Sequence, residues 1–133
     1  MKTKTIALTT SIIMFLMGVF PSCNNDPTQY KRQMVRLARL VIDSAQLGNY
    51  NALLKEEIEA SMRLEPGVLT LYAAAEKNDL THITILEIYA DTVAYKAHLL
   101  TPHFIKYKNE TKDMVRSLEL VETVPLVPGM KIK

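Results

Sequence analysis

Residues 94–107, AYKAHLLTPHFIKY, contain two of the three histidines of the chain, His98 and His103, on either side of a Thr-Pro step. Histidine changes its charge near neutral pH and can take a proton from a bound hydroxyl group. A carboxylate, Glu87, lies inside the apolar segment LTHITILEIY, where its burial would be unfavourable without a partner. One interpretation is that Glu87 orients a histidine of residues 94–107, which then moves protons.

Two of these residues also have a structural explanation. Glu87 could form an ion pair with Arg36 or Arg39 of the first predicted strand, since structural ion-pair networks also shift pKa values. His103, in the first turn of a predicted helix, could be solvated or could bond the preceding loop. Both explanations stay open at the level of the sequence.

Aromatic residues near His98 favour a binding cavity. His98 follows Tyr95 by one helical turn on the same predicted stripe, which suggests that both line a cavity. Tyr72 and Tyr89 could offer hydroxyl groups to a polar aromatic ligand, although a tyrosine on a strand more often belongs to the core or the sheet edge.

A metal site is not expected from the histidine spacing. Metal-binding pairs on one helix are three or four residues apart, whereas His98 and His103 are five apart with Pro102 between them. The chain has four glycines, too few for a typical dinucleotide cradle. Its only cysteine, Cys23, precedes the predicted domain, so cysteine catalysis and disulfides are excluded there.

The elements that must position these residues follow from the apolar periodicity. Alternation of apolar and other residues predicts strands, and apolar residues three and four apart predict helices. Pro66 and Gly67 end the first helix, and Thr101-Pro102 begins the last one. The predicted elements are a strand at 34–42, a helix from 43–44 to 64, strands at 68–76 and 80–89, helices at 91–100 and 102–113, and a strand from 115. This β-α-β-β-α-β order is the ferredoxin-like α+β pattern.

The first residues read as a leader rather than as part of the domain. Lys2 and Lys4 precede an apolar run that ends near Pro21, Ser22 and Cys23, as in a secretory signal. We expect a signal peptide at 1–23, a tether at 24–33 and one domain at 34–133. A loosely matching lipobox makes Cys23 the candidate lipidation site; a plain cleaved signal or an uncleaved anchor is the alternative. The protein is then exported to the periplasmic face or the outer membrane of a bacterium, and meets the membrane only through its signal or lipid.

Charge argues against a nucleic-acid partner. The chain carries 16 Lys+Arg and 14 Asp+Glu, and removal of Lys2 and Lys4 leaves 14 against 14, a formally neutral domain. A basic footprint of the kind that binds phosphates is therefore absent from the composition.

Two segments, EPGVLTLY and LEIYADTVAYKAHLLTPHF, resemble the antibiotic biosynthesis monooxygenase family, most closely its small quinol-monooxygenase-like members. The resemblance extends over about residues 35–124. The motif positions are met by Glu65, Pro66, Gly67, Leu69 or Leu71, Tyr72, Glu87, Tyr89, Asp91, Ala94, His98, His103 and Phe104.

The resemblance implies a homodimer in which two sheets pack back to back, a dimeric α+β barrel, with a cavity between sheet and helices. Members of the family oxidise phenolic or quinol substrates with O₂ and without flavin, metal or haem, so no cofactor is expected. His98 is the expected base, Glu87 the group that orients it and His103 the second choice. The expected substrate pocket consists of Tyr72, Tyr89, Arg39 and Phe104.

The chain departs from two branches of the family. It has no Trp, on which haem-degrading and polyketide-type relatives depend, and Lys108 stands where the former have a haem-ligating histidine. The expected function is oxidation of a quinol or polyphenol-like aromatic. The alternatives are a non-catalytic dimeric domain that binds a small aromatic molecule, and an isomerase.

Overall fold

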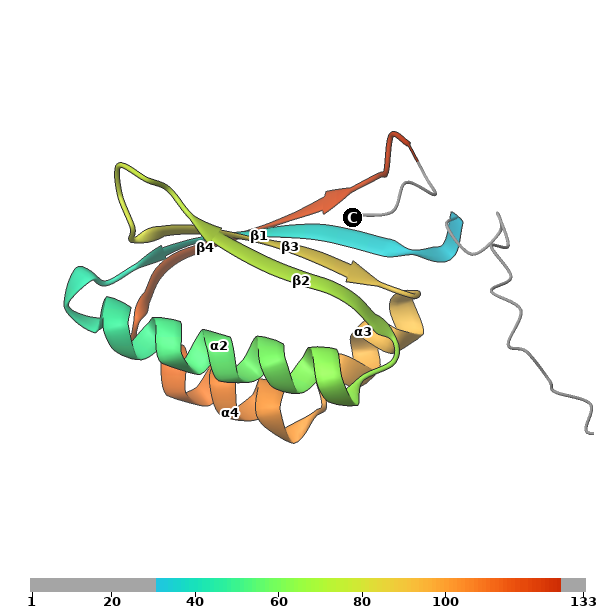
Figure 1. Cartoon of the computed structure of the whole chain (residues 1–133), viewed down its shortest axis with the longest axis horizontal. Helices are drawn as coiled ribbons and strands as arrows, with labels where there is room; N and C mark the ends of the chain where they lie inside the picture. The colour runs from blue at the N-terminus through green and yellow to red at the C-terminus, as the bar shows by residue number, and fades with distance from the viewer. Residues whose placement is uncertain (1–30, 128–133) are drawn as a thin grey trace, which may run out of the picture.

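The computed structural model describes residues 31–127, which form one four-stranded sheet with helices packed on one of its faces (Figure 1). The expected leader, the tether up to residue 30 and Cys23 lie outside the described residues. The elements are β1 (Met34–Ile42), η1 (Ser44–Gln46), α2 (Leu47–Leu64), β2 (Val68–Ala75), β3 (His82–Tyr89), α3 (Thr92–His98), α4 (Pro102–Thr111) and β4 (Val115–Thr123). In the described part, no helix is long and apolar enough to cross a membrane.

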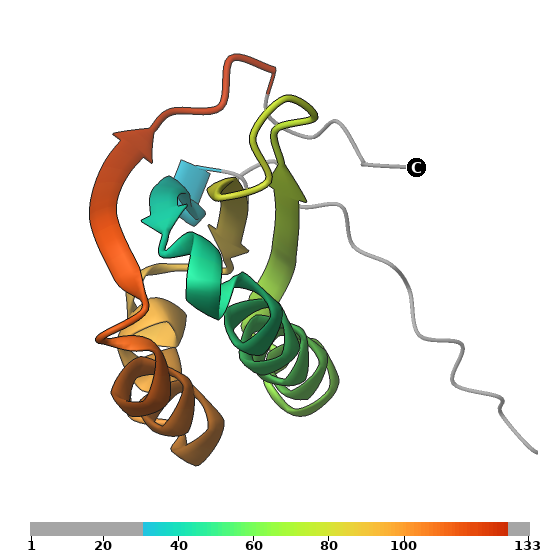
Figure 2. The same cartoon turned by 90° about the vertical axis from the view of Figure 1, so that its left-hand side faces the viewer.

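The sheet has the strand order β2-β3-β1-β4, and every neighbouring pair is antiparallel. This confirms the ferredoxin-like prediction. Figure 2 shows the sheet curving over the helices, with β2 and β4 at its opposite edges. The bounds of β1 agree with the alternation in MVRLARLVI, because each residue there faces the side opposite to its neighbours.

The core lies between the central strands and α2. Ala38, Leu40 and Ile42 of β1 are buried against the helices, as are Ile83 and Ile85 of β3. The other face of β1 presents Leu37 and Val41, which no helix of the described residues covers. The sheet therefore has apolar residues on both faces but a helical layer on only one.

A buried tyrosine pair joins α2 to α4. The hydroxyl oxygens of Tyr50 and Tyr107 are 2.7 Å apart and share a hydrogen bond. Tyr50 is completely buried, and burial raises its pKa to about 12. The pair satisfies two polar atoms inside the core and holds α4 against α2.

The Thr-Pro step between the two histidines ends one helix and begins the next. Thr101 caps α4: its Oγ1 accepts from the Phe104 N–H at 3.4 Å, and the same hydroxyl donates to the His98 carbonyl at 2.8 Å. Pro102 fills the first helical position, where no N–H is needed. His98 thus lies at the end of α3 and His103 in the first turn of α4.

Candidate active site

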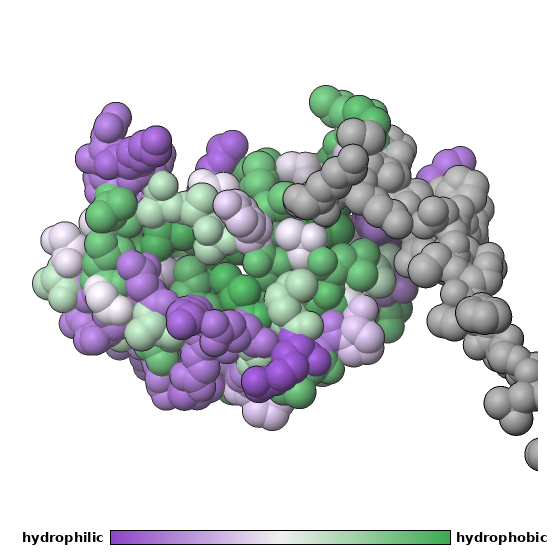
Figure 3. Space-filling view, in the orientation of Figure 1, coloured by the Kyte–Doolittle hydropathy of each residue, from purple (hydrophilic) through white to green (hydrophobic). Residues whose placement is uncertain are grey.

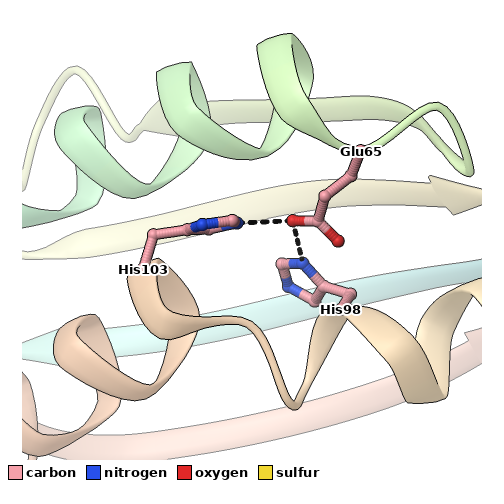
Figure 4. A group of neighbouring side chains, drawn as sticks. All are labelled: Glu65, His98 and His103. Carbon is pink, nitrogen blue, oxygen red and sulfur yellow. Dashed lines mark hydrogen bonds and ion pairs between the residues drawn. The ribbon is translucent and has the colours of Figure 1, made fainter.

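Glu65, His98 and His103 form one hydrogen-bonded cluster (Figure 4). One oxygen, Oε1 of Glu65, lies 3.0 Å from Nδ1 of His98 and 2.6 Å from Nε2 of His103. An ionised carboxylate oxygen only accepts, so each of these two ring nitrogens carries a proton. In a neutral His98 this tautomer leaves Nε2 with its lone pair, which is the form that can act as a base.

Glu65 is positioned by the end of α2 and by the turn that follows. Burial alone would raise its pKa, but the hydrogen bonds from His103 and His98 outweigh burial and lower the pKa below the usual value. Glu65 is therefore held ionised between the two rings. In the sequence, Glu65 is a position of the family motif, and no local pattern gives it a role in the site.

Glu57 on α2, about two helical turns before Glu65, also approaches His98. Its Oε1 lies 3.7 Å from Nε2 of His98 and accepts a hydrogen bond of 2.7 Å from Ser61 Oγ. Glu57 is a carboxylate that is only 5% exposed. Burial raises its pKa, which favours the protonated carboxyl. His98 therefore lies between a carboxylate whose pKa is lowered, at Nδ1, and one whose pKa is raised, near Nε2.

Glu87 does not take the position that was expected of it. Its Oε2 accepts a 3.1 Å hydrogen bond from the Tyr89 hydroxyl, and its strand position pairs with Arg36 of β1. Within the described residues, neither histidine makes a hydrogen bond or ion pair with Glu87; Glu65 takes that place. Burial raises the pKa of Glu87, against the opposing effects of the Tyr89 bond and the Arg36 charge.

A cavity of about 370 Å³ opens between the sheet and the helices and reaches the edge formed by β4. His98, Glu57 and Glu87 lie in its wall, whereas Glu65 does not. Nε2 of His98 is on the side of Glu57, another residue of the cavity wall. The apolar part of the wall includes Leu40, Leu54, Ile85, Phe104, Leu118 and Leu120. Figure 3 shows apolar residues gathered across the middle of one face, above the charged lower edge that the helices form.

The four residues of the expected pocket divide into two pairs. Tyr89 and Phe104 line the cavity, and the Phe104 ring centre is 4.6 Å from that of His98. Tyr72 is 68% exposed on β2, and Arg39 points to the uncovered face, where it pairs with Glu119. Of the two arginines of β1, Arg36 is the one that lines the cavity. Periodicity showed that the two arginines lie on opposite faces but could not show which face the helices cover.

The same cluster is a donor set for a metal ion. One ligand atom from each of Glu65, His98 and His103 lies within 4.8 Å of the others. The five-residue spacing of the histidines, which argued against a metal, does not apply to this arrangement, because the third donor, Glu65, comes from the turn after α2. Hydrogen bonds to the shared Glu65 oxygen also account for these contacts without a metal. Adding a chelator to the oxygen-uptake assay distinguishes a metal site from a hydrogen-bonded cluster.

Comparisons with known proteins agree with this architecture. Residues 34–110, more than half of the chain, match the family model described as antibiotic biosynthesis monooxygenase. A solved structure from Bacteroides thetaiotaomicron, provisionally named for this family, is 62% identical with a TM-score of 0.77; the match covers 78% of this chain and 99% of that one. No protein of curated function matches in sequence.

More distant structures share the fold. A protein from Lactobacillus acidophilus, provisionally named a monooxygenase, is 28% identical with a TM-score of 0.68; the match covers 71% of this chain and 44% of that one. One from Nitrosomonas europaea is 19% identical with a TM-score of 0.68, over 73% and 93% of the two chains. From the family model and the similarity to the Bacteroides protein, the chain belongs to the antibiotic biosynthesis monooxygenase family.

Proposed function

We propose that this protein is a cofactor-independent monooxygenase that oxidises a quinol or polyphenol-like aromatic with O₂. The observation that carries the proposal is the environment of His98. His98 is 2% exposed, lines the cavity and is held by Glu65 in the tautomer whose Nε2 can accept a proton.

The chemistry needs a base and a place for the anion that forms. His98 takes the proton of a ring hydroxyl, and the electron-rich anion then forms a carbon–oxygen bond with O₂. The peroxide intermediate loses water as its O–O bond breaks and the ring carbon gives up its hydrogen. One oxygen atom remains on the ring as a carbonyl, so that quinol and O₂ give hydroxyquinone and water. Glu57, which burial favours in its protonated form, is the proposed proton donor to the departing oxygen.

Oxygen uptake by the full chain tests the proposal. With a panel of benzene and naphthalene quinols, uptake is expected above the autoxidation rate and unchanged by EDTA, because none of the proposed steps uses a metal. Loss of uptake in EDTA that returns with added zinc or iron would instead assign a metal to the Glu65 cluster. No uptake, together with ligand-induced thermal stabilisation, would favour the non-catalytic binding domain.

We also propose a homodimer formed through the uncovered face of the sheet. Leu37 lies at the centre of this face, between Leu86 on β3 and Val121 on β4. Exposed apolar faces of this kind commonly mark protein interfaces. Sedimentation at micromolar concentration is expected to give a dimer that Leu37→Asp converts to monomer. Leu80→Asp, in an exposed loop position, is the control that keeps the dimer. A monomeric parent chain would contradict the barrel.

Export stays a proposal that concerns residues outside the described part. A lipid on Cys23 would keep the chain in the membrane fraction, and Cys23→Ser would release it. An unchanged distribution in this variant would reject lipidation.

A further inference from the structure

Arg36 is a buried cation in the cavity wall with an incomplete set of partners. It is 8% exposed and lines the cavity near the start of β1. Its Nη1 donates to the Tyr95 hydroxyl at 2.7 Å, and its guanidinium carbon lies 4.5 Å from the centre of the Tyr95 ring. Nε is buried and has no partner among the described residues.

The unpartnered Nε–H and the weakly bonded Nη2 lie together on one edge of the guanidinium. Nε–H and Nη2–H project from the same side of the planar group, the edge that binds a carboxylate through two parallel hydrogen bonds. Nη2 reaches only Glu122, at 3.4 Å, and the side chain of Glu122 is 79% exposed. The contact is long and solvated, so an anion inside the cavity could replace it without a large cost.

Among the described residues, no buried carboxylate makes a hydrogen bond or ion pair with Arg36, although the charge of Glu87 acts on it from a distance. Glu87 is the cross-strand neighbour of Arg36, but no hydrogen bond or ion pair joins them in the described structure. Burial raises the pKa of Glu87, which weakens its role as a counter-charge. A buried charge is normally paired, so the arrangement is one that a bound anion would complete.

Arg36 and the proposed base, His98, lie on different parts of the cavity wall. The Tyr89 ring centre lies 5.3 Å from that of Tyr95 and 5.4 Å from that of His98, so aromatic side chains separate the guanidinium from the imidazole. Both groups are in the wall of the same cavity. A ligand that contacts both must therefore carry its two polar groups on different parts of an aromatic framework.

We propose that the Nε–Nη2 edge of Arg36 binds a carboxylate of the substrate while a ring hydroxyl of the same molecule faces His98. The substrate class is then a hydroxyaryl carboxylic acid. This inference rests on the proposed function for the aromatic nature of the ligand, but the carboxylate site can be tested by binding alone.

Calorimetry with two ligands of equal shape, 6-hydroxy-2-naphthoate and 6-hydroxy-2-naphthamide, tests the site on the full chain. We expect the acid to bind about tenfold more tightly than the amide, as charge-assisted hydrogen bonds commonly provide. Arg36→Gln is expected to make the two affinities equal. Arg39→Gln is the matched control, because Arg39 lies on the same strand but on the uncovered face, and it should keep the preference.

Two further variants keep the test decisive if Arg36→Gln does not fold. Glu122→Gln removes the competing exposed carboxylate and is expected to tighten binding of the acid but not of the amide. Lys112→Gln, in the cavity wall at the end of α4, should leave the preference unchanged. Equal affinities in the parent chain, no binding of either ligand, or a preference lost only in Lys112→Gln would overturn the inference. Preference for the acid without oxygen uptake would keep it and reject the monooxygenase.

Discussion

Replacing His98 with glutamine is expected to lower kcat for quinol oxidation by about 10²- to 10⁴-fold, the usual effect of losing a general base. Glutamine is close in size to histidine and can still hydrogen-bond Glu65, but it cannot take a proton from the substrate. The measurement is oxygen uptake at saturating quinol, with the KM determined separately. A fall in kcat with little change in KM is expected, because the lost interaction belongs to the proton transfer.

Two variants separate the base from its surroundings. His82→Gln changes a half-exposed histidine near Glu76 that does not line the cavity of His98, and it is expected to leave kcat unchanged. Glu65→Gln keeps a hydrogen-bond acceptor but removes the charge that holds the tautomer of His98, so a smaller loss of kcat is expected. Full activity in His98→Gln would exclude His98 as the base.

Glu65→Gln should also change how stability depends on pH. The folded-state pKa of Glu65 is lowered, so its ionised form contributes stability above the unfolded-state pKa of about 4.3, and this contribution is lost as the pH falls through the folded-state value. In Glu65→Gln, the free energy of unfolding should therefore fall less steeply than in the parent chain as the pH is lowered through this range.

Local signals explain how much of the fold was predictable. Thr101-Pro102 and Asp91 identify helix starts because their capping contacts involve residues only three positions away. The strand β1 was predicted with its observed bounds, since alternation depends on neighbouring residues alone. Turns and caps of this kind need no knowledge of the tertiary structure.

The contacts that define the candidate site join residues far apart in the sequence. Glu65 meets His98 and His103 across 33 and 38 positions of the chain, a distance over which no local pattern operates. Glu87 was the more conspicuous carboxylate, because it interrupts an apolar strand, and the prediction that it contacts a histidine was wrong. The choice between Arg36 and Arg39 failed for a related reason, since both faces of β1 are apolar and only the helices distinguish them.

Gly67→Ala is expected to destabilise the fold by about 1–3 kcal/mol, the usual cost of forcing a methyl group into a packed contact. A Cβ atom at Gly67 would lie 2.6 Å from Cβ of Ala94 on α3, far inside van der Waals contact. Gly67 is required for this close approach rather than for the turn itself. The turn carries Glu65 and α3 carries His98, so a displaced α3 should also lower oxidation.

The double variant Gly67→Ala, Ala94→Gly provides the decisive comparison. Ala94→Gly alone should cost about 1 kcal/mol through weaker helix propensity, but it removes the atom with which the new methyl group collides. The next atom, Cα of Ala94, is 3.6 Å away, an ordinary contact. Urea denaturation of the four proteins should therefore show the double variant to be more stable than the sum of the single effects predicts. Strict additivity would mean that the collision is relieved elsewhere, and that the Glu65 turn and α3 are not held together by this contact.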